Sequence, residues 1–422
     1  PRWGADSEDS KTPMAHDLRL ATRNLKGCYE HTLSFDDPVN GKSYRLAPDG
    51  LALPVKRVPG LALPDGDHLL DGEPMPLHLI ELVQHIWLNR DTPEARVIYF
   101  PKLENDEEAV YLAATIDAAE RAVARRYPSY PLGSVRVILV FENPRAIFRI
   151  REMGEALYPY FLGGSLGWHD FLASTARLFR HDSSYRIPVK ADPDIVIRNI
   201  KESHAILVRD LSEAGALKIG GMYGILYQPG DIESFAACMV GYIRDVVTQL
   251  KRGLDGFWVA HPDFVRIGIA LVEAWGQQQA APESTVLHDL VRALVPLKDE
   301  HPALLAFIDG PDIAKLDESD PRYLRAVLAS EIGVSPVIAN DDPDEIRYNV
   351  FQALQYLADW LRGNGCVALP AKLKLGQKPV FVRVMDDLAT TERSRWEVWA
   401  EVHHGRVSLD AFEEILAEEV AF

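Results

Sequence analysis

Short apolar runs alternate with longer amphipathic stretches along residues 1–279. The runs are rich in β-branched residues and have the length of buried strands, whereas the stretches between them place apolar residues on one helix face. Strands are expected at 51–58, 96–100, 135–141, 160–166, 216–222 and 256–260, with helices at 77–88, 107–126, 192–211 and 232–250. This pattern gives roughly eight strand–helix units, as in an α/β protein. That number of units predicts a (β/α)8 TIM barrel rather than an open doubly wound sheet.

The pattern changes near residue 285. Helical periodicity continues at 286–294, 321–332, 344–362 and 409–419, while strand signals become few. We therefore predict a barrel over residues 1–284 and a helical C-terminal domain over 285–422. Outside the barrel, an Asn40-Gly41 pair between 36 and 44 predicts a small hairpin.

Two carboxylates follow two successive predicted strands. Glu142 comes directly after the run 135–141, and Asp170 follows the run 160–166. Catalytic groups of parallel barrels lie at this end of the strands, and two hard oxygen ligands on an open rim suit Mg²⁺. Helix capping explains the pattern equally well, since Asn143-Pro144 has the form of an N-cap followed by a first helical residue.

Composition and charge exclude several classes of protein. A net charge of −17 argues against nucleic acid as the main partner. There is no apolar run long enough for a membrane span and no visible signal peptide. The 3 cysteines form no CxxC pair and indicate thiols in a reducing compartment. Neither a GxGxxG dinucleotide motif nor a P-loop occurs, and histidine spacing indicates no zinc site.

Two polar segments are ambiguous when taken alone. Trp3–Ser10 ends a short predicted strand and carries Asp6, Glu8 and Asp9, but a solvated acidic loop has the same composition. Met385–Arg395 reads as an acidic loop that begins a helix.

Eight motifs in order resemble the malate synthase family, of the short, single-barrel type. They are ADSEDS (5–10), PKLEN (101–105), FEN (141–143), GWHD (167–170), IGGM (219–222), DGFWVAHPD (255–263), QYLADWLRGNGC (355–366) and MDDLATTERSR (385–395). Each motif is weak by itself, but together they span essentially the whole chain.

The resemblance implies a transferase that condenses acetyl-CoA with glyoxylate and hydrolyses malyl-CoA to malate and CoA. This chemistry needs a base for the weakly acidic methyl group, a group that stabilises the enolate, and a Lewis acid for the aldehyde. The implied cofactor is Mg²⁺, and the implied partners are the two substrates. Neither nucleic acid nor a membrane is implied, the oligomeric state is left open, and the cytoplasm is the expected location because the C-terminal Val-Ala-Phe is no peroxisomal signal.

The resemblance also assigns residues. Glu142 and Asp170 carry over as the metal ligands, and Asp387 as the catalytic base. Backbone N–H groups at Gly167, Trp168 and His169 would receive the glyoxylate carboxylate at a helix N-terminus. Asp6 and Glu8 match acidic residues that orient the water ligands of the metal.

Three departures separate this chain from the family pattern. In the family, an arginine directly before a glycine at the end of the second strand stabilises the enolate and contacts glyoxylate. An ungapped alignment places Pro59 at that position, and Arg57 is the candidate for this catalytic role if one or two residues are inserted locally. Trp168-His169 replaces the usual Arg-Trp, and residues 371–384 form an extra segment.

Lys102 could face the site or form an ion pair, and Arg145 is a second cation beside Glu142.

These departures keep two other functions open. One is a lyase of the malyl-CoA or citramalyl-CoA type, or another condensing variant for a different acyl-CoA and oxoacid. The other is a ligand-binding relative with weak catalysis, which the displaced arginine motivates.

Overall fold

The computed structural model of the chain describes residues 2–11, 14–187, 193–330, 341–375 and 378–422. Its residues form two compact units. Unit 1 comprises residues 1–174, 214–216 and 357–366; unit 2 comprises 175–213, 217–356 and 367–422.

A parallel sheet forms the centre of unit 1. Its strands pair in the order β1 (Arg2–Asp6), β4 (Leu53–Arg57), β7 (Val97–Phe100), β8 (Arg136–Phe141) and β9 (Phe161–Leu166). The last residues of adjacent strands lie in register, Asp6 opposite Arg57 and Phe141 opposite Leu166. Residues that follow these strands therefore meet at one edge of the sheet.

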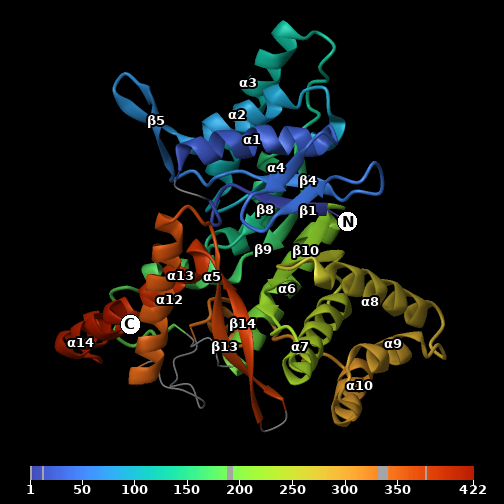
Figure 1. Cartoon of the computed structure of the whole chain (residues 1–422), viewed down its shortest axis with the longest axis vertical. Helices are drawn as coiled ribbons and strands as arrows, with labels where there is room; N and C mark the ends of the chain where they lie inside the picture. Colours follow the sequence, from blue (N-terminus) through green and yellow to red (C-terminus); the bar gives the residue numbers. More distant parts are fainter. Residues whose placement is uncertain (1, 12–13, 188–192, 331–340, 376–377) are drawn as a thin grey trace. The chain divides into compact units, whose positions relative to one another are not determined.

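Helices cover the sheet of unit 1, as the blue and green ribbons of Figure 1 show. They are α1 (Ala15–Tyr29), α2 (Leu77–Leu88), α3 (Asp106–Arg126), α4 (Ile150–Ala156) and the start of α5 (Trp168–Leu178), with short 3-10 turns η1 (Pro93–Arg96) and η2 (Ala146–Phe148). Two hairpins complete the unit, β2 (Ser34–Asp37) with β3 (Lys42–Arg45), and β5 (Pro64–Leu70) with β6 (Glu73–Pro76). The first confirms the hairpin predicted from Asn40-Gly41, with Gly41 at φ +63°.

The predicted helix start at Asn143-Pro144 is wrong. Asn143 Oδ1 accepts the N–H of Arg145 at 2.8 Å and closes a local turn. A 3-10 turn follows from Ala146, and the α-helix begins only at Ile150. The side chain of Asn143 therefore satisfies a turn rather than capping the helix.

Unit 2 is mainly helical, with a smaller share of strand. Its elements are α6 (Pro193–Glu213), β10 (Leu217–Tyr223), β11 (Ile225–Leu226), α7 (Ile232–Lys251), β12 (Gly256–Val259), α8 (Asp263–Ala280), α9 (Val286–Leu294), η3 (Lys298–Glu300), α10 (His301–Asp309), α11 (Tyr323–Val327), most of α12 (Pro343–Leu361), β13 (Val367–Leu375), β14 (Lys378–Asp386), α13 (Leu388–His403) and α14 (Leu409–Ala421). Strands β10 and β12 pair in parallel. The core of the unit surrounds α7, where Tyr242, Ile243 and Val246 are fully buried.

The long hairpin of β13 and β14 corrects the expectation that strands are few beyond residue 285 (Figure 1, orange). Its described part contains most of the extra segment 371–384. Val380 and Val382 are buried whereas Phe381 is 43% exposed, which is the alternation of a strand with one face on a core. Phe381 O accepts the hydroxyl of Ser234 on α7 at 2.7 Å, which fixes the hairpin within unit 2.

An α/β fold with parallel strands and a helical C-terminal region is thus confirmed. The predicted helix at 321–332 is reduced to α11, and its last two residues lie outside the described residues. In the described part of the chain, no helix has both the length and the apolar character that a membrane crossing needs.

Candidate active site

Glu142 and Asp170 lie past the ends of neighbouring strands, β8 and β9. Both are buried, at 3% and 9% exposure. Gly167 lies between them in sequence and is small for a direct reason: a Cβ atom there would stand 2.2 Å from Glu142 Oε2. The carboxylate of Glu142 thus rests against the backbone of the turn that leads into α5.

An acidic turn follows β1, formed by residues 6–9. Arg57, at the end of β4, holds this turn through ion pairs to Asp6, Glu8 and Asp9 at 3.2, 2.9 and 2.8 Å. Asp6 also closes the turn locally, since its Oδ1 accepts the N–H of Glu8 at 2.8 Å. Arg57 therefore points toward the carboxylates at this edge of the sheet.

Lys102 connects the acidic turn to both predicted metal ligands. Its backbone N–H donates to Glu142 Oε1 at 2.8 Å, and its ammonium group contacts Asp170 Oδ2 at 2.8 Å. The same ammonium group pairs with Glu8 and Asp9 at 2.9 and 2.8 Å. Lys102 has a φ of +59°, which costs energy for a residue with a side chain. The surrounding contacts hold it in this conformation.

The charges in this cluster do not balance. Five carboxylates (Asp6, Glu8, Asp9, Glu142 and Asp170) share two cations, Arg57 and Lys102. Burial, followed by the charges of Asp9 and Glu142, raises the pKa of Asp170 well above its usual value. Burial and Asp9 likewise raise the pKa of Glu8. Lys102 and Arg57 overcome burial at Asp9 and lower its pKa.

This excess of buried negative charge fits an added cation. Magnesium commonly takes only one or two carboxylates from a protein and keeps water or substrate at its other positions. Glu142 and Asp170 match that donor set. Within the residues that the structure describes, no three His, Cys, Asp or Glu side chains are arranged to hold a metal by themselves.

The predicted glyoxylate-binding residues lie at the N-terminal end of α5. The N–H of Gly167 donates to Phe141 O at 3.4 Å, and Trp168 and His169 form the first turn of the helix. Arg145, the alternative cation, is directed away from the cluster: its side chain is 58% exposed and pairs with Glu104.

Asp387, the predicted base, lies in unit 2, where it is the N-cap of α13. Its Oδ1 accepts the backbone N–H of Thr390 at 3.2 Å and the hydroxyl of the same residue at 3.4 Å. The predicted start of a helix in this segment is therefore observed, but the predicted acidic loop is not, because Met385 and Asp386 end β14 and Asp387 leads directly into α13.

The sequence pattern assigns no role to Asp9 and does not decide between two positions for Lys102. Both were visible as charged residues at strand ends, in ADSEDS and PKLEN. Spacing gave no reason to prefer Asp9 over Glu8, because the direction of each side chain depends on how the turn closes.

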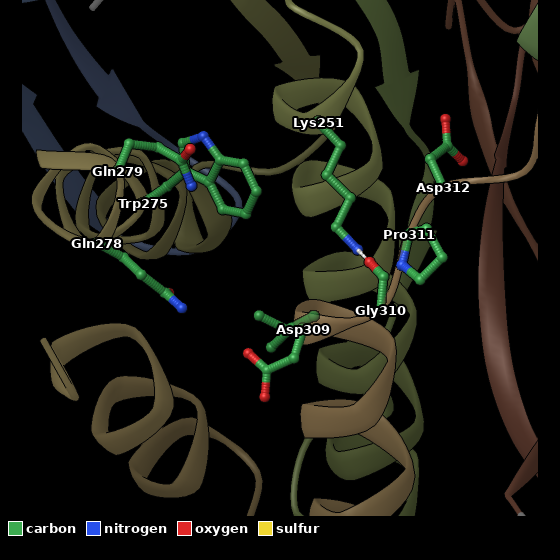
Figure 2. Close-up of a pocket in the computed structure, with 9 residues that line it drawn as sticks. Lys251, Trp275, Gln278, Gln279, Asp309, Gly310, Pro311 and Asp312 are labelled. Carbon is green, nitrogen blue, oxygen red and sulfur yellow. Dashed lines mark hydrogen bonds between the residues drawn. The ribbon is translucent and has the colours of Figure 1, made fainter. Parts of the chain in front are cut away.

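A separate cavity of about 390 Å³ lies in unit 2, between α7, α8 and the end of α10 (Figure 2). None of the predicted site residues lines it. Lys251 donates to the carbonyls of Phe307 and Gly310 at 2.6 and 2.7 Å, so its ammonium group caps the end of α10.

Comparisons with known proteins agree with the motifs. The family model "Malate synthase, TIM barrel domain" matches residues 54–287, and "Malate synthase, C-terminal" matches residues 340–421. Malate synthase of Myxococcus xanthus is 25% identical, over 99% of this chain and 69% of that protein. Malate synthase A of Escherichia coli is 23% identical, over 99% and 70%.

A solved structure supports the fold. The pyruvate/acetyl-CoA ternary complex of Haloferax volcanii malate synthase aligns with a TM-score of 0.52 at 12% identity, over 98% of this chain and 88% of that one.

These matches define a transferase of the acyl-CoA condensing class. The chain belongs to the malate synthase family. The family and the enzyme class predicted from the sequence are therefore confirmed, and neither alternative function is favoured by these comparisons.

Proposed function

We propose that this chain is a magnesium-dependent malate synthase, which condenses acetyl-CoA with glyoxylate and hydrolyses malyl-CoA to malate and CoA. One observation supports the proposal above all. Glu142 and Asp170 lie beyond the ends of β8 and β9, and Lys102 connects both of them to the acidic turn of residues 6–9. The cluster that these residues form has an excess of negative charge. A cluster of this kind favours a divalent cation.

Glu142 and Asp170 are proposed to hold the Mg²⁺ ion, with Asp6 and Glu8 orienting its water ligands. When bound, the ion would polarise the glyoxylate aldehyde as a Lewis acid. The N-terminal end of α5, at Trp168 and His169, would attract the glyoxylate carboxylate, because the positive end of a helix dipole favours an anion. The N–H of Gly167 is donated to Phe141 O instead.

Arg57 is proposed to take the place of the family's arginine and stabilise the enolate oxygen. Its contacts with three carboxylates keep it charged: Asp6, Asp9 and Glu8 outweigh burial and raise its pKa well above the usual value. A permanently charged guanidinium group at the rim of the sheet suits a developing negative charge.

Asp387 is proposed as the base that removes a proton from the acetyl-CoA methyl group. Its position as a helix N-cap fixes the carboxylate through two contacts with Thr390. A fixed carboxylate can be aimed at one carbon atom, which general base catalysis requires.

The architecture implied by the family is part of the same proposal. We propose that the parallel strands belong to a closed (β/α)8 barrel over residues 1–284, with residues 285–422 as the C-terminal domain. The "TIM barrel domain" match over 54–287 supports this division. The cytoplasmic location stays a prediction.

The test is the release of free CoA thiol by the purified chain. Thiol should appear only when acetyl-CoA, glyoxylate and Mg²⁺ are all present, and omission of any one should abolish it. A lyase would instead leave the CoA thioester intact after turnover, which mass analysis of the products would detect. Binding of Mg²⁺ and glyoxylate without thiol release on a panel of acyl-CoA compounds would contradict catalysis.

A further inference from the structure

A buried ion pair lies next to the candidate site, on the other side of β4. Lys56 pairs with Glu81 of α2, and the two residues are only 3% and 5% exposed. The ammonium group of Lys56 also donates to the hydroxyl of Ser7 at 2.5 Å. Removing two charges from water costs about as much free energy as their attraction returns. An apolar pair of similar volume therefore often gives a protein the same stability. Stability alone therefore gives little reason for this pair.

The position of Ser7 suggests what the pair does. Ser7 lies between Asp6 and Glu8 and is 6% exposed. Because side chains alternate along a strand, Lys56 and Arg57 leave β4 on opposite sides. Arg57 contacts the carboxylates of Asp6, Glu8 and Asp9, whereas Lys56 contacts the hydroxyl of Ser7.

The backbone of the turn is tied to the same strand. The N–H of Ser7 donates to Arg57 O at 3.2 Å, and Asp6 lies opposite Arg57 in the parallel register. Two cations adjacent in sequence thus hold the acidic turn from both of its sides. Glu81 holds the ammonium group of Lys56 on the side of β4 where it contacts Ser7.

We propose that Lys56, Glu81 and Ser7 are positioning residues that set the acidic turn of residues 6–9 for metal binding. This rests on the proposed function, since it assumes that the turn orients the water ligands of Mg²⁺. Residues that orient ligands in this indirect way typically change metal affinity 10- to 100-fold when they are altered.

The test is calorimetric titration of Mg²⁺ into the full chain, together with the thermal midpoint of each variant. Ser7→Ala removes the acceptor with almost no change of volume. The double variant Lys56→Met with Glu81→Met replaces the ion pair without leaving one charge buried alone. Both should bind Mg²⁺ about 10-fold more weakly. The double variant should keep a thermal midpoint equal to or above that of the wild type, whereas Ser7→Ala, which leaves a buried N–H of Lys56 without its acceptor, should lower the midpoint slightly.

Glu120→Gln is the matched control. Glu120 is a fully buried carboxylate of unit 1 that accepts N–H groups before β8, at the end of the strand away from Glu142. The substitution Glu120→Gln should lower the thermal midpoint of the chain and leave its Mg²⁺ affinity unchanged. Wild-type affinity in Ser7→Ala would overturn the positioning role, even if the double variant failed to fold. A wild-type chain that does not bind Mg²⁺ would instead overturn the proposed function itself.

Discussion

At the scale of single residues, Gly167 tests how the Glu142 carboxylate is placed. Gly167→Ala would put a Cβ atom 2.2 Å from Glu142 Oε2 and 2.7 Å from its Cβ, so the carboxylate must move. We expect Mg²⁺ affinity to fall by on the order of 100-fold, measured by calorimetry. Gly66→Ala, where no atom lies within 4 Å of the added Cβ, is the control and should bind Mg²⁺ normally.

Asp387 tests the assignment of the base. Asp387→Asn keeps the oxygen that accepts from Thr390 but loses the ability to take a proton. We expect thiol release to slow by about 10²- to 10⁴-fold while glyoxylate binding is retained. Asp410→Asn, an exposed carboxylate in the first turn of α14, is the matched control. A wild-type rate in the Asp387 variant would rule out its role as base.

At the scale of elements, Glu120 of α3 anchors the segment that leads into β8. Its carboxylate accepts the N–H groups of Gly133, Ser134 and Val135 at 2.6, 3.0 and 3.1 Å. Glu120→Ala leaves these donors without their acceptor, and we expect the free energy of unfolding to fall by about 2–4 kcal/mol. Urea denaturation measures this. An unchanged midpoint would show that the segment does not depend on the anchor.

Asp245, a residue of α7, makes the free energy of unfolding of the chain depend on pH. Burial raises its pKa from 3.8 to about 6. Between about pH 4 and 6 the folded chain therefore binds a proton that the unfolded chain lacks, and this contribution to stability is lost as the pH rises through that range. Asp245→Asn should stabilise the chain by about 1–2 kcal/mol at pH 7.5 and by almost nothing at pH 4. Denaturation at both pH values checks this, and an equal effect at both would contradict it.

Helices and strands could be predicted from the sequence where their apolar residues repeat with a single period. The helix at 77–88 has the bounds of α2, because its apolar positions repeat on one face and Pro76 precedes it. The β13–β14 hairpin was missed because Leu373, Val380 and Val382 are separated by lysines and prolines, which are unusual in strands. The antiparallel pairing of β13 with β14 forms the hairpin, and the contact of Phe381 with Ser234 on α7 fixes its place in unit 2.

At the scale of the whole molecule, the carboxylates that follow strands could be predicted, and the family resemblance named Arg57 as a candidate cation, but the contacts of Arg57 and Lys102 could not be predicted. Parallel strands bring their ends to one edge, so Glu142 and Asp170 were expected near each other from position alone. The direction of Arg57 and the double contact of Lys102 depend on how the acidic turn closes and on a positive φ at Lys102. No local pattern in PKLEN encodes that conformation.

Calorimetric titration of Mg²⁺ into the full chain measures whether Glu142 and Asp170 hold a magnesium ion. The wild-type chain should bind one ion, and Glu142→Gln and Asp170→Asn should each weaken binding by at least about 10-fold while remaining folded. Glu120→Gln should bind Mg²⁺ as the wild type does. Wild-type affinity in both ligand variants would contradict the account.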